Sequence, residues 1–344
     1  MVKVAINGFG RIGRALLKLV FKEPRLAGQL EIVAINDLGD VENLAYLLKY
    51  DTAYGRSGLD VKVVGGSLIV NGKEIKFIQQ KDPTTLPWKD MGVDIVVESS
   101  GVFDSYEKAK AHLVAGAKRV VITAPVKDLP KDAGITGATI LLGINDEEIK
   151  DAVITSNASC TTNAAGPVMK ILNDAIGIEK ALLNTTHAMT ATQAVVDSPT
   201  KGDYRRGRAA SHNLIPASTG AAIAISKVIK GLDGVFDGIA IRVPMITGSL
   251  ADITFISKRN TTREEINDIL RKAASDPKWK NIYTATDEEI VSSDIIGLPY
   301  ASIADLTSTK VVGGNLVKVL AWYDNEMGYT NTLADHVLKV ASFL

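Results

Sequence analysis

The first third of the chain alternates short apolar runs with segments of helical periodicity. Val2–Ile6 is an apolar run that ends at Asn7-Gly8, which is typical of a buried strand. Similar runs follow at Glu31–Asn36, Ile95–Val97 and Arg119–Ile122. The segments Arg11–Phe21 and Tyr106–Ala115 instead favour helices, and the first of them places on one face Ile12, Ala15, Leu16, Leu19 and Val20. Strands that alternate with helices predict right-handed crossovers and a parallel sheet.

Two later stretches depart from this pattern. Within residues 60–78, Asn71-Gly72 lies between β-rich runs and predicts a hairpin, an antiparallel excursion from the parallel sheet. After about residue 155 the β-rich runs become longer, at Val235–Val243, Ser249–Ser257 and Lys310–Tyr323, and favour a mixed or antiparallel sheet. Apolar residues recur at helical spacing over Asn331–Leu344, and we expect this helix to pack on the first domain.

These patterns predict an α/β chain with two domains. Residues 1–158 would form a Rossmann-type, doubly wound dinucleotide-binding domain, completed by a C-terminal helix at 329–344. Residues 159–328 would form an α+β catalytic domain with a mixed or antiparallel sheet. The length of 344 residues agrees with this division, because single domains have about 100–200 residues.

Charge and composition narrow the possible functions. Lys plus Arg and Asp plus Glu both number 39, so the formal net charge is zero. This argues against a general surface for nucleic acids and other polyanions, but not against a local anion pocket. A single Cys excludes an internal disulfide and fits a reducing compartment. The N-terminus lacks the pattern of a signal peptide and no run of 18 apolar residues is present, so we expect a cytoplasmic protein without a membrane span.

Residues 8–13 match the pattern G-x-G-x-x-G through Gly8, Gly10 and Gly13. The pattern is weak alone, but here it follows a predicted strand and opens a predicted helix, which is the context of a dinucleotide site. The glycines allow a tight turn and let a pyrophosphate approach the helix N-terminus. Asp37 ends the second strand, where its carboxylate can accept hydrogen bonds from ribose hydroxyls. The simpler alternative is a structural glycine turn with a solvated Asp37.

The one cysteine, Cys160, lies in the polar block Ser156–Asn163, directly before a helical pattern at Ala164–Leu172. A lone cysteine is in general a buried, inert thiol. At a helix N-terminus, however, the macrodipole and the N–H groups lower the pKa of a thiol. We therefore expect Cys160 to be a nucleophile with a lowered pKa.

His187 is the candidate base for this thiol. It follows the apolar start of a strand at Ala181–Leu183, in the same domain as Cys160, and a histidine so placed can act as a base or ion-pair partner. The other histidines have no such context and are expected to be structural: His112, His212 and His336.

Two arginine regions are candidate anion sites. Arg242 lies inside the apolar strand Ile239–Val243, where an unpaired charge is costly and an anion or a carboxylate partner is required. The run Arg205–Arg208 is either such a site or a solvated basic loop. Thr219-Gly220 precedes an apolar run and offers a second helix N-terminus for an anion.

Taken together, these residues resemble the glyceraldehyde-3-phosphate dehydrogenase family over essentially the whole chain. The block Ser-Asn-Ala-Ser-Cys-Thr-Thr-Asn at 156–163 is highly specific to it. The other matching landmarks are residues 7–14, Asn36-Asp37-Leu38, His187–Thr190, Pro216–Ala222, Arg242-Val243-Pro244 and Trp322–Glu326.

The resemblance implies a role for each matching position. Cys160 would be the nucleophile and His187 its activating partner. The cofactor would be NAD, contacted by Gly8, Gly10, Arg11, Ile12, Gly13, Asp37, Lys81, Ser100, Gly101, Thr123 and Asn325. Thr190 and Arg242 would hold the substrate phosphate. The site of the attacking inorganic phosphate would be shaped by Ser159, Thr161, Arg206, Thr219 and Gly220. No metal is implied.

The resemblance also implies a reaction and an assembly. The chain would oxidise glyceraldehyde 3-phosphate reversibly, through a Cys160 hemithioacetal and thioester, in glycolysis or gluconeogenesis. The family is a homotetramer, so 159–328 would also be the tetramerisation domain, with the loop near Met189–Asn213 at a subunit contact. Ala164, Met189 and Met327 depart from the commonest residues of the family. Pro199 stands where a Ser accompanies NADP use in some relatives, and with Asp37 it favours NAD.

Two alternatives stay open at this point. The related erythrose-4-phosphate dehydrogenase uses the same chemistry, although Thr190, Arg242 and Ser218–Gly220 favour the glyceraldehyde enzyme. Alternatively, the protein could be a mainly non-catalytic one that binds NAD or RNA. Zero net charge and the intact Cys160/His187 pair argue against that role.

Overall fold

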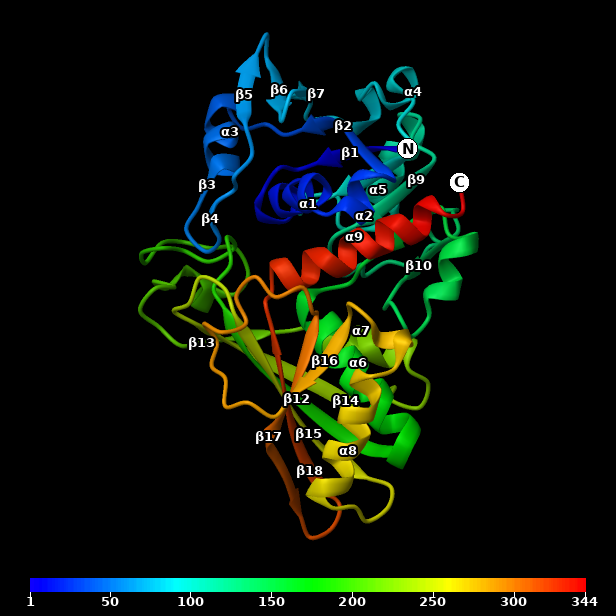
Figure 1. Cartoon of the computed structure of the whole chain (residues 1–344), viewed down its shortest axis with the longest axis vertical. Helices are drawn as coiled ribbons and strands as arrows, with labels where there is room; N and C mark the ends of the chain where they lie inside the picture. Colours follow the sequence, from blue (N-terminus) through cyan, green and yellow to red (C-terminus); the bar gives the residue numbers. More distant parts are fainter. The chain divides into compact units, whose positions relative to one another are not determined.

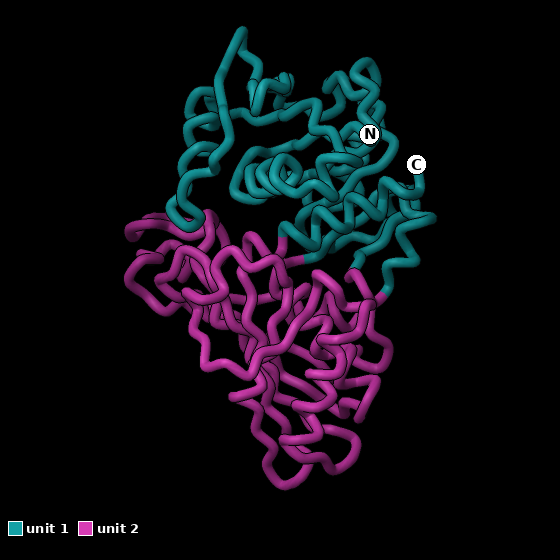
Figure 2. Tube along the Cα trace, viewed as in Figure 1, with its two compact units in different colours: residues 1–140, 145–158, 330–344 teal, residues 141–144, 159–329 magenta.

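The computed structural model describes all residues from 1 to 344. The chain divides into two compact units (Figure 2). Unit 1 holds residues 1–140, 145–158 and 330–344, and unit 2 holds 141–144 and 159–329. Unit 1 is therefore assembled from three separate parts of the sequence. The last of these parts carries most of helix α9 (Met327–Ala341), which is red in Figure 1.

Unit 1 is built on a nine-stranded sheet in the order β10-β11-β9-β8-β1-β2-β7-β6-β5. All neighbours from β10 to β7 are parallel, which confirms the predicted parallel sheet. The strands are β1 (Val2–Asn7), β2 (Leu30–Asn36), β5 (Val61–Val64), β6 (Ser67–Val70), β7 (Lys73–Ile78), β8 (Ile95–Glu98), β9 (Arg119–Ile122), β10 (Gly137–Thr139) and β11 (Ile154–Ser156). A separate small hairpin joins β3 (Tyr50–Asp51) to β4 (Gly55–Arg56).

The predicted hairpin within residues 60–78 is confirmed. β6 pairs antiparallel with both β5 and β7, and Val70 faces Lys73 across a two-residue turn. Asn71 and Gly72 have φ of 48° and 79° in this turn. Positive φ at both central residues is what a tight hairpin of this length requires, and Asn-Gly meets that demand at low cost.

Apart from α9, the helices of unit 1 lie between its strands in the sequence. They are α1 (Arg11–Lys22), α2 (Pro24–Ala27), α3 (Val41–Lys49), α4 (Trp88–Met91) and α5 (Tyr106–Val114), with short 3-10 turns at Pro83–Thr85 and Asp146–Asp151. Four of the five residues predicted on the apolar face of α1 are buried, namely Ala15, Leu16, Leu19 and Val20. This burial fixes the start of α1, and with it the glycine loop, against the sheet.

Unit 2 is built on a seven-stranded mixed sheet in the order β13-β14-β12-β15-β18-β17-β16, as predicted for the second half. Its strands are β12 (Ile178–Ala188), β13 (Ile215–Ser218), β14 (Phe236–Val243), β15 (Ser249–Ser257), β16 (Tyr283–Thr286), β17 (Ser302–Val312) and β18 (Leu316–Tyr323). The prediction of a single β-rich run at Lys310–Tyr323 is wrong. This stretch is the end of β17 and all of β18, separated by a turn in which Gly313 and Gly314 have positive φ.

Helices α6 (Cys160–Ile176) and α8 (Arg263–Ala274) pack on this sheet, and α7 (Ala221–Val228) packs on β14 and α6 (Figure 1). Two 3-10 turns complete the unit, at Tyr204–Gly207 and Pro277–Trp279. No helix of either unit has the length and apolar character needed to cross a membrane.

Candidate functional site

Cys160 is the first residue of α6, so the predicted helix start at this cysteine is confirmed. Ser159 is the N-cap, and its Oγ accepts a hydrogen bond from the Thr162 N–H at 3.1 Å. The cap satisfies one of the N–H groups that a helix start leaves without an intrahelical partner. Cys160 itself is partly exposed and forms no disulfide.

Strand pairing brings His187 to this cysteine. β12 and β14 are parallel neighbours, and His187 near the end of β12 pairs in register with Arg242 on β14. The Sγ of Cys160 lies 3.3 Å from Nε2 of His187. A nucleophile and a base within hydrogen-bonding distance are the geometric requirement for an activated thiol.

The other ring nitrogen of His187 has two competing neighbours. Nδ1 lies 2.7 Å from the Ala188 carbonyl oxygen and 2.6 Å from Nη1 of Arg242. A carbonyl only accepts and a guanidinium only donates, so Nδ1 can satisfy one of them at a time. Burial, with a smaller contribution from the Arg242 charge, lowers the pKa of His187 to about 3. The imidazole is therefore neutral at ordinary pH.

The expected lowering of the Cys160 pKa is wrong. Burial raises the pKa of the thiol above its usual value, while the charge of Arg242 and hydrogen bonds from Thr161 act in the opposite direction. Although Cys160 keeps some exposed surface, the surrounding side chains bury its sulfur deeply enough for desolvation to dominate. The protein thus holds a neutral thiol beside a neutral imidazole.

A buried tyrosine that the sequence reasoning missed supports the pair. Tyr323 is 1% exposed, and its hydroxyl lies 2.9 Å from Oγ1 of Thr161 and 2.6 Å from Oγ1 of Thr185. Its ring meets the His187 ring edge-on, with centroids 5.9 Å apart. Tyr323 therefore ties the start of α6 to β12 and fixes the plane of the imidazole.

Arg242 has no carboxylate partner. Its Nη1 contacts only His187 and the Ala188 carbonyl oxygen, the latter at 3.2 Å. Burial lowers the pKa of Arg242, and the positive charge of Arg206 adds to this effect. Arg206 lies in the turn Tyr204–Gly207, 3.9 Å from Asp203. Arg242 and Arg206 are thus close enough to interact electrostatically, and Arg242 has no counterion. This arrangement of positive charge is typical of an anion-binding site.

The remaining residues predicted for the phosphates lie in the same unit. Thr190 follows the end of β12 and is partly exposed, with its Oγ1 3.0 Å from Oγ1 of Thr192. Thr219 accepts from the Ala221 N–H at 3.2 Å, and Gly220 caps α7 without a side chain. These two are not brought beside Arg242 by strand pairing, because β13 pairs Ile215, not Ser218, with Arg242.

In unit 1 the glycine loop joins β1 to α1. Gly8 has φ of 95°, and a Cβ there would lie 2.4 Å from the Ser100 backbone nitrogen. A Cβ on Gly13 would lie 2.3 Å from the Gly8 carbonyl oxygen, so neither position tolerates a side chain. Gly10 caps α1 with no side-chain hydrogen bond, and the first turn has no acidic residue. The loop therefore fits a pyrophosphate at the helix N-terminus.

The other residues predicted for the cofactor lie at the same edge of the sheet. Asp37 follows β2 and accepts from Phe9 N at 2.6 Å and Gly39 N at 2.8 Å, which orients its carboxylate beside the glycine loop. Arg11 and Ile12 open α1, and Arg11 pairs with Asp51 at 2.9 Å. The rest lie in loops: Ser100 and Gly101 after β8 and Lys81 after β7 are exposed, and Thr123 after β9 is partly buried.

Asn325 belongs to unit 2 and is 7% exposed. Its Oδ1 accepts from Gly248 N at 3.1 Å and from the Ser249 hydroxyl at 2.9 Å. Because the oxygen is held by two donors, the amide orientation is fixed and Nδ2 is the atom available to donate to a ligand.

Comparison with known proteins agrees with both halves of this picture. Residues 2–106 match the model of the glyceraldehyde 3-phosphate dehydrogenase NAD binding domain, and residues 159–325 match the C-terminal domain of the same family. The curated glyceraldehyde-3-phosphate dehydrogenase of Clostridium pasteurianum is 47% identical over 99% of this chain and 100% of its own length. Those of Kluyveromyces lactis and Borreliella burgdorferi are each 45% identical over at least 98% of both chains.

This chain belongs to the glyceraldehyde-3-phosphate dehydrogenase family. The predicted family, the Rossmann-type domain and the class of NAD-dependent oxidoreductase are thereby confirmed. NAD is the cofactor of the matched N-terminal domain.

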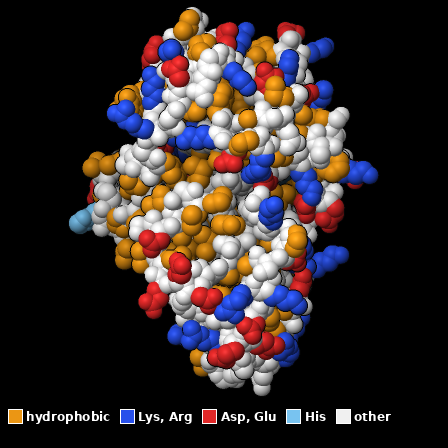
Figure 3. All heavy atoms as spheres, viewed as in Figure 1, with side chains coloured by type: hydrophobic (Ala, Val, Ile, Leu, Met, Phe, Trp, Pro, Cys, Tyr) orange, Lys and Arg blue, Asp and Glu red, His pale blue; other side chains and the backbone are white.

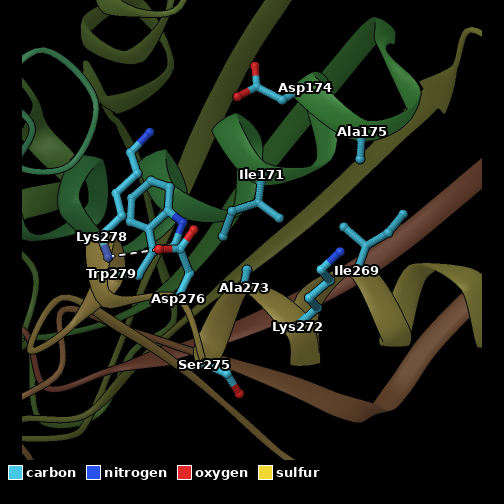
Figure 4. Close-up of a pocket in the computed structure, with 10 residues that line it drawn as sticks. All are labelled: Ile171, Asp174, Ala175, Ile269, Lys272, Ala273, Ser275, Asp276, Lys278 and Trp279. Carbon is cyan, nitrogen blue, oxygen red and sulfur yellow. Dashed lines mark hydrogen bonds between the residues drawn. The ribbon is translucent and has the colours of Figure 1, made fainter.

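In this family member one hollow lies away from the candidate catalytic residues. A cavity of 620 Å³ lies between α6 and the α8–Trp279 segment (Figure 4). On α6 it is lined by Ile171, Asp174 and Ala175, in the last turns of a helix that Cys160 begins. At 1.5 Å rise per residue, Asp174 is about 20 Å from Cys160 along the axis. None of the predicted site residues lines this hollow.

Proposed function

We propose that the chain catalyses the reversible conversion of glyceraldehyde 3-phosphate, NAD and inorganic phosphate to 1,3-bisphosphoglycerate and NADH. The observation that carries this proposal is the Cys160–His187 contact of 3.3 Å beside Arg242, a cation without a carboxylate partner. A thiol, a base and an anion-binding cation are what oxidation of a phosphorylated aldehyde through a thioester requires.

The first step forms a bond between sulfur and the aldehyde carbon. The Cys160 thiol gives its proton to Nε2 of His187 as the sulfur attacks, and the carbonyl oxygen becomes an oxyanion. A neutral imidazole with its proton on Nδ1, donated to the Ala188 carbonyl oxygen, leaves Nε2 free to accept. The N–H groups at the start of α6 stabilise the oxyanion, which then takes back the proton held on Nε2 to give the hemithioacetal and a neutral imidazole.

The second step oxidises the hemithioacetal. NAD, when bound, would supply the acceptor for the hydride that leaves the former aldehyde carbon. His187 removes the hydroxyl proton at the same time, and a thioester of Cys160 results. Inorganic phosphate then attacks the acyl carbon, the sulfur leaves as a thiolate, and Nε2 returns its proton. The product is an acyl phosphate, and the cysteine is restored.

Arg242 has a double role in this scheme. Without substrate, its guanidinium lies against Nδ1 of His187 and helps to keep the pKa of the imidazole low. A substrate phosphate that binds Arg242 partly neutralises this charge and draws the guanidinium away from Nδ1. The base therefore becomes stronger when the substrate is in place, because the main charge opposing its protonation has been neutralised.

We further propose the assignment of the cofactor residues. Gly8, Gly10, Gly13, Arg11 and Ile12 would surround the pyrophosphate, and Asp37 the adenosine ribose. The Asn325 amide would donate to the nicotinamide carboxamide. The nearby loops contribute Lys81, Ser100, Gly101 and Thr123. The support is the geometry of the glycine loop, the fixed orientations of Asp37 and Asn325, and the common sheet edge.

The phosphates would be divided between two groups of residues. Thr190 and Arg242 would hold the substrate phosphate, since Thr190 follows the end of β12 and Arg242 lies near the end of β14, its neighbour in the sheet. Arg206, Thr219 and Gly220 would bind inorganic phosphate, with Ser159 and Thr161 supporting the start of α6 between them. In the free chain the Ser159 hydroxyl caps α6 and the Thr161 hydroxyl contacts Tyr323, which supports a structural part in their roles.

A homotetramer is also proposed, with the loop Met189–Asn213 at a subunit contact. This segment and the residue after it expose large apolar side chains: Val195 is 77%, Val196 70%, Tyr204 84% and Leu214 71% exposed. Such a group of exposed apolar residues is typical of a protein interface. Sedimentation analysis of the wild-type chain and of Val196→Asp checks this, with a smaller assembly expected for the variant.

The test of function is NADH formation from glyceraldehyde 3-phosphate with and without inorganic phosphate. Sustained turnover only in its presence supports the proposal, and sustained turnover without it contradicts the thioester route. Erythrose 4-phosphate in the same assay separates the related dehydrogenase, which would prefer it. RNA binding without turnover would instead favour a binding protein. Figure 3 argues against that role, because basic and acidic side chains are interspersed on the face shown.

A further inference from the structure

The order in which the chain adds strands to the sheet of unit 1 reverses direction between β1 and β8, and we call this place the divergence point. The chain runs outward from β1 to β2 on one side and from β8 to β9 and β11 on the other. In doubly wound sheets the ligand lies across such a point, outside the carboxyl ends of the strands. The last residues of the two strands, Asn7 and Glu98, face each other in register there.

Glu98 is a buried carboxylate, 2% exposed, and it pairs with neither Lys nor Arg. Its Oε2 accepts from Nδ2 of Asn7 at 2.5 Å and lies 2.9 Å from Nε2 of His112. Its Oε1 accepts from the Ser100 N–H at 2.8 Å and from the Ser100 hydroxyl at 2.5 Å. Four donors therefore surround one side chain, which satisfies the buried charge without a cation.

A tryptophan sets the direction of the His112 hydrogen bond. The indole N–H of Trp88 donates to Nδ1 of His112 at 3.2 Å, and an indole nitrogen can only donate. Nδ1 is consequently an acceptor, so the proton of the neutral ring is on Nε2 and points at Glu98. His112 is 0% and Trp88 0% exposed, and the edge of the Phe103 ring contacts His112 with centroids 6.1 Å apart.

The network reaches both sides of the divergence point. Asn7 accepts at Oδ1 from Asn36, which ends β2, at 2.7 Å. Asn36 in turn bonds both backbone groups of Gln80, the residue before Lys81. On the other side Ser100 lies directly under the glycine loop, since a Cβ on Gly8 would meet its backbone nitrogen at 2.4 Å. One carboxylate thus links the loops after β1, β2 and β8.

We propose that Glu98, with its proton donor His112 and the orienting Trp88, positions the Ser99–Gly101 loop against the glycine loop for binding of the nicotinamide half of the dinucleotide. The inference rests on the proposed assignment of Gly8–Gly13, Asp37 and Ser100 to NAD. Asp37 and the glycine loop hold the adenosine side and the pyrophosphate, so the loop after β8 lies on the side of the other nucleotide. Glu98, His112 and Trp88 are positioning residues and touch no reacting atom.

Only a carboxylate satisfies this site. In Glu98→Gln the amide NH₂ would replace one of the two oxygens. At the Oε2 position it would face two donors whose directions are fixed by Asn36 and Trp88. At the Oε1 position it would face the Ser100 N–H, which cannot turn round. The substituted chain must therefore move the Ser99–Gly101 loop or leave a buried donor unsatisfied.

The experiment compares the affinities of the full-length protein for NAD and for adenosine 5′-monophosphate, a probe of the adenosine side alone. Glu98→Gln should weaken NAD binding at least about tenfold, the scale of one charge-assisted hydrogen bond, and change binding of the monophosphate less than about threefold. Trp88→Phe keeps an aromatic side chain but removes the indole N–H together with the five-membered part of the ring, so it should lower the melting temperature, weaken NAD binding about threefold and spare the monophosphate.

The matched control is Asp94→Asn. Asp94 directly precedes β8, at the amino ends of the parallel strands. Its carboxylate accepts from Lys3 N at 2.9 Å and pairs with Lys118 at 2.7 Å. This variant should lower the melting temperature and leave both affinities within about twofold of wild type, since its contacts lie at the opposite edge of the sheet from the glycine loop.

The outcomes separate the two claims. A wild-type chain that does not bind NAD overturns the proposed function, and this inference with it. Normal wild-type binding combined with an equal loss of both ligands in Glu98→Gln overturns the inference alone. So does a loss of NAD affinity in Asp94→Asn as large as that in Glu98→Gln. If Glu98→Gln does not fold, an unchanged NAD affinity in Trp88→Phe is sufficient to reject the positioning role.

Discussion

The two units each bury a small polar cluster around a histidine, and the clusters are built on opposite principles. Around Glu98 in unit 1, every acceptor position faces a donor and the tautomer of His112 is fixed. Around His187 in unit 2, Nδ1 has two neighbours that it cannot satisfy together, and Arg242 has no counterion. A complete network holds one geometry, whereas an incomplete one can change when a ligand supplies the missing group.

The difference explains where chemistry can occur. In the proposed mechanism a proton leaves Cys160 and returns to it, so the hydrogen bonds around His187 must be able to rearrange. Binding of a large cofactor across a sheet edge instead requires loops that stay in place before the ligand arrives. Under the two proposals above, the completeness of a buried network distinguishes a positioning cluster from a reacting one.

Removal of the nucleophile should have the largest effect. Cys160→Ser should reduce oxidation of the aldehyde by a factor of about 10³ or more, because a hydroxyl is a far weaker nucleophile than the sulfur that forms the thioester. NAD affinity should remain within about twofold, since Cys160 lies in unit 2 and the glycine loop in unit 1. Steady-state turnover and a binding titration measure the two quantities. Full activity after verified alkylation of Cys160 would exclude the mechanism.

The two arginines should affect different phases of the reaction. Arg242→Ala should slow the first NADH formed or raise the KM for the aldehyde, by about ten- to a hundredfold, because a charge-assisted contact to the substrate phosphate is lost. Arg206→Ala should leave the first turnover nearly intact and slow phosphorolysis, so that a burst of NADH precedes a slow steady state. Rapid-mixing traces distinguish them.

The same traces can reject this division of roles. If Arg206→Ala suppresses the burst, or if Arg242→Ala alters only the phosphate-dependent phase, the assignment of the two phosphates is reversed or wrong. If Arg206→Ala has no effect in either phase, Arg206 is a solvated surface charge. Its 3.9 Å contact with Asp203 is consistent with that result as well.

Cofactor choice should show a smaller effect. NAD should be preferred over NADP by more than about tenfold in kcat/KM, because the proposed position of Asp37 at the adenosine ribose would bring its carboxylate against the additional 2′-phosphate. Asp37→Ala should narrow this ratio. It should also loosen the loop, since Asp37 holds the N–H groups of Phe9 and Gly39. Equal kcat/KM values for the two cofactors in the wild type would refute the role of Asp37.

The smallest effect concerns a third buried histidine. His336 in α9 is 0% exposed, and burial lowers its pKa to about 3, against 6.5 in an unfolded chain. Between pH 6.5 and 3 the unfolded chain binds a proton that the folded chain does not, so stability is present above pH 6.5 and is lost as the pH falls. The slope for one such group is at most about 1.4 kcal/mol per pH unit.

His336→Asn keeps a donor near the position of Nδ1, which lies 3.0 Å from Oδ1 of Asn157, and removes the titration. Denaturant unfolding at pH 7, 6 and 5 should therefore show a shallower loss of stability in the variant than in the wild type. An unchanged slope would mean that His336 does not contribute, and that His187 and the carboxylates account for the acid sensitivity.

Much of the fold could be predicted because local pattern and final structure agree. The parallel strands, α1 and the Asn71-Gly72 hairpin follow directly from apolar periodicity and turn chemistry. Helix α8 was missed although a signal was present. Thr262 and Glu265 have the spacing of a capping box, and the Thr262 hydroxyl does accept from Glu265 N at 3.2 Å.

For the candidate site, only those properties that depend on a short stretch of sequence could be predicted. Cys160 at a helix start is a local property, and it was found. The sign of the pKa shift of Cys160 was not predictable, because it depends on burial by segments that are distant in the sequence, such as the strand that carries His187. The Glu98–His112 contact was also missed. It depends on the register of β8 and on the packing of α5, neither of which an apolar strand pattern specifies.

The three-part construction of unit 1 has a consequence for synthesis on the ribosome. Residues 330–344 follow all of unit 2 in the sequence, yet they carry Leu333, Val337 and Val340, all buried in the complete unit 1. Every residue of unit 2 is translated before them, so the unit begun first is finished last. Chains emerge at about 5–20 residues per second, which leaves the apolar surface that α9 will cover exposed for many seconds. A nascent chain of this protein should therefore depend most on chaperones after its catalytic half has already folded.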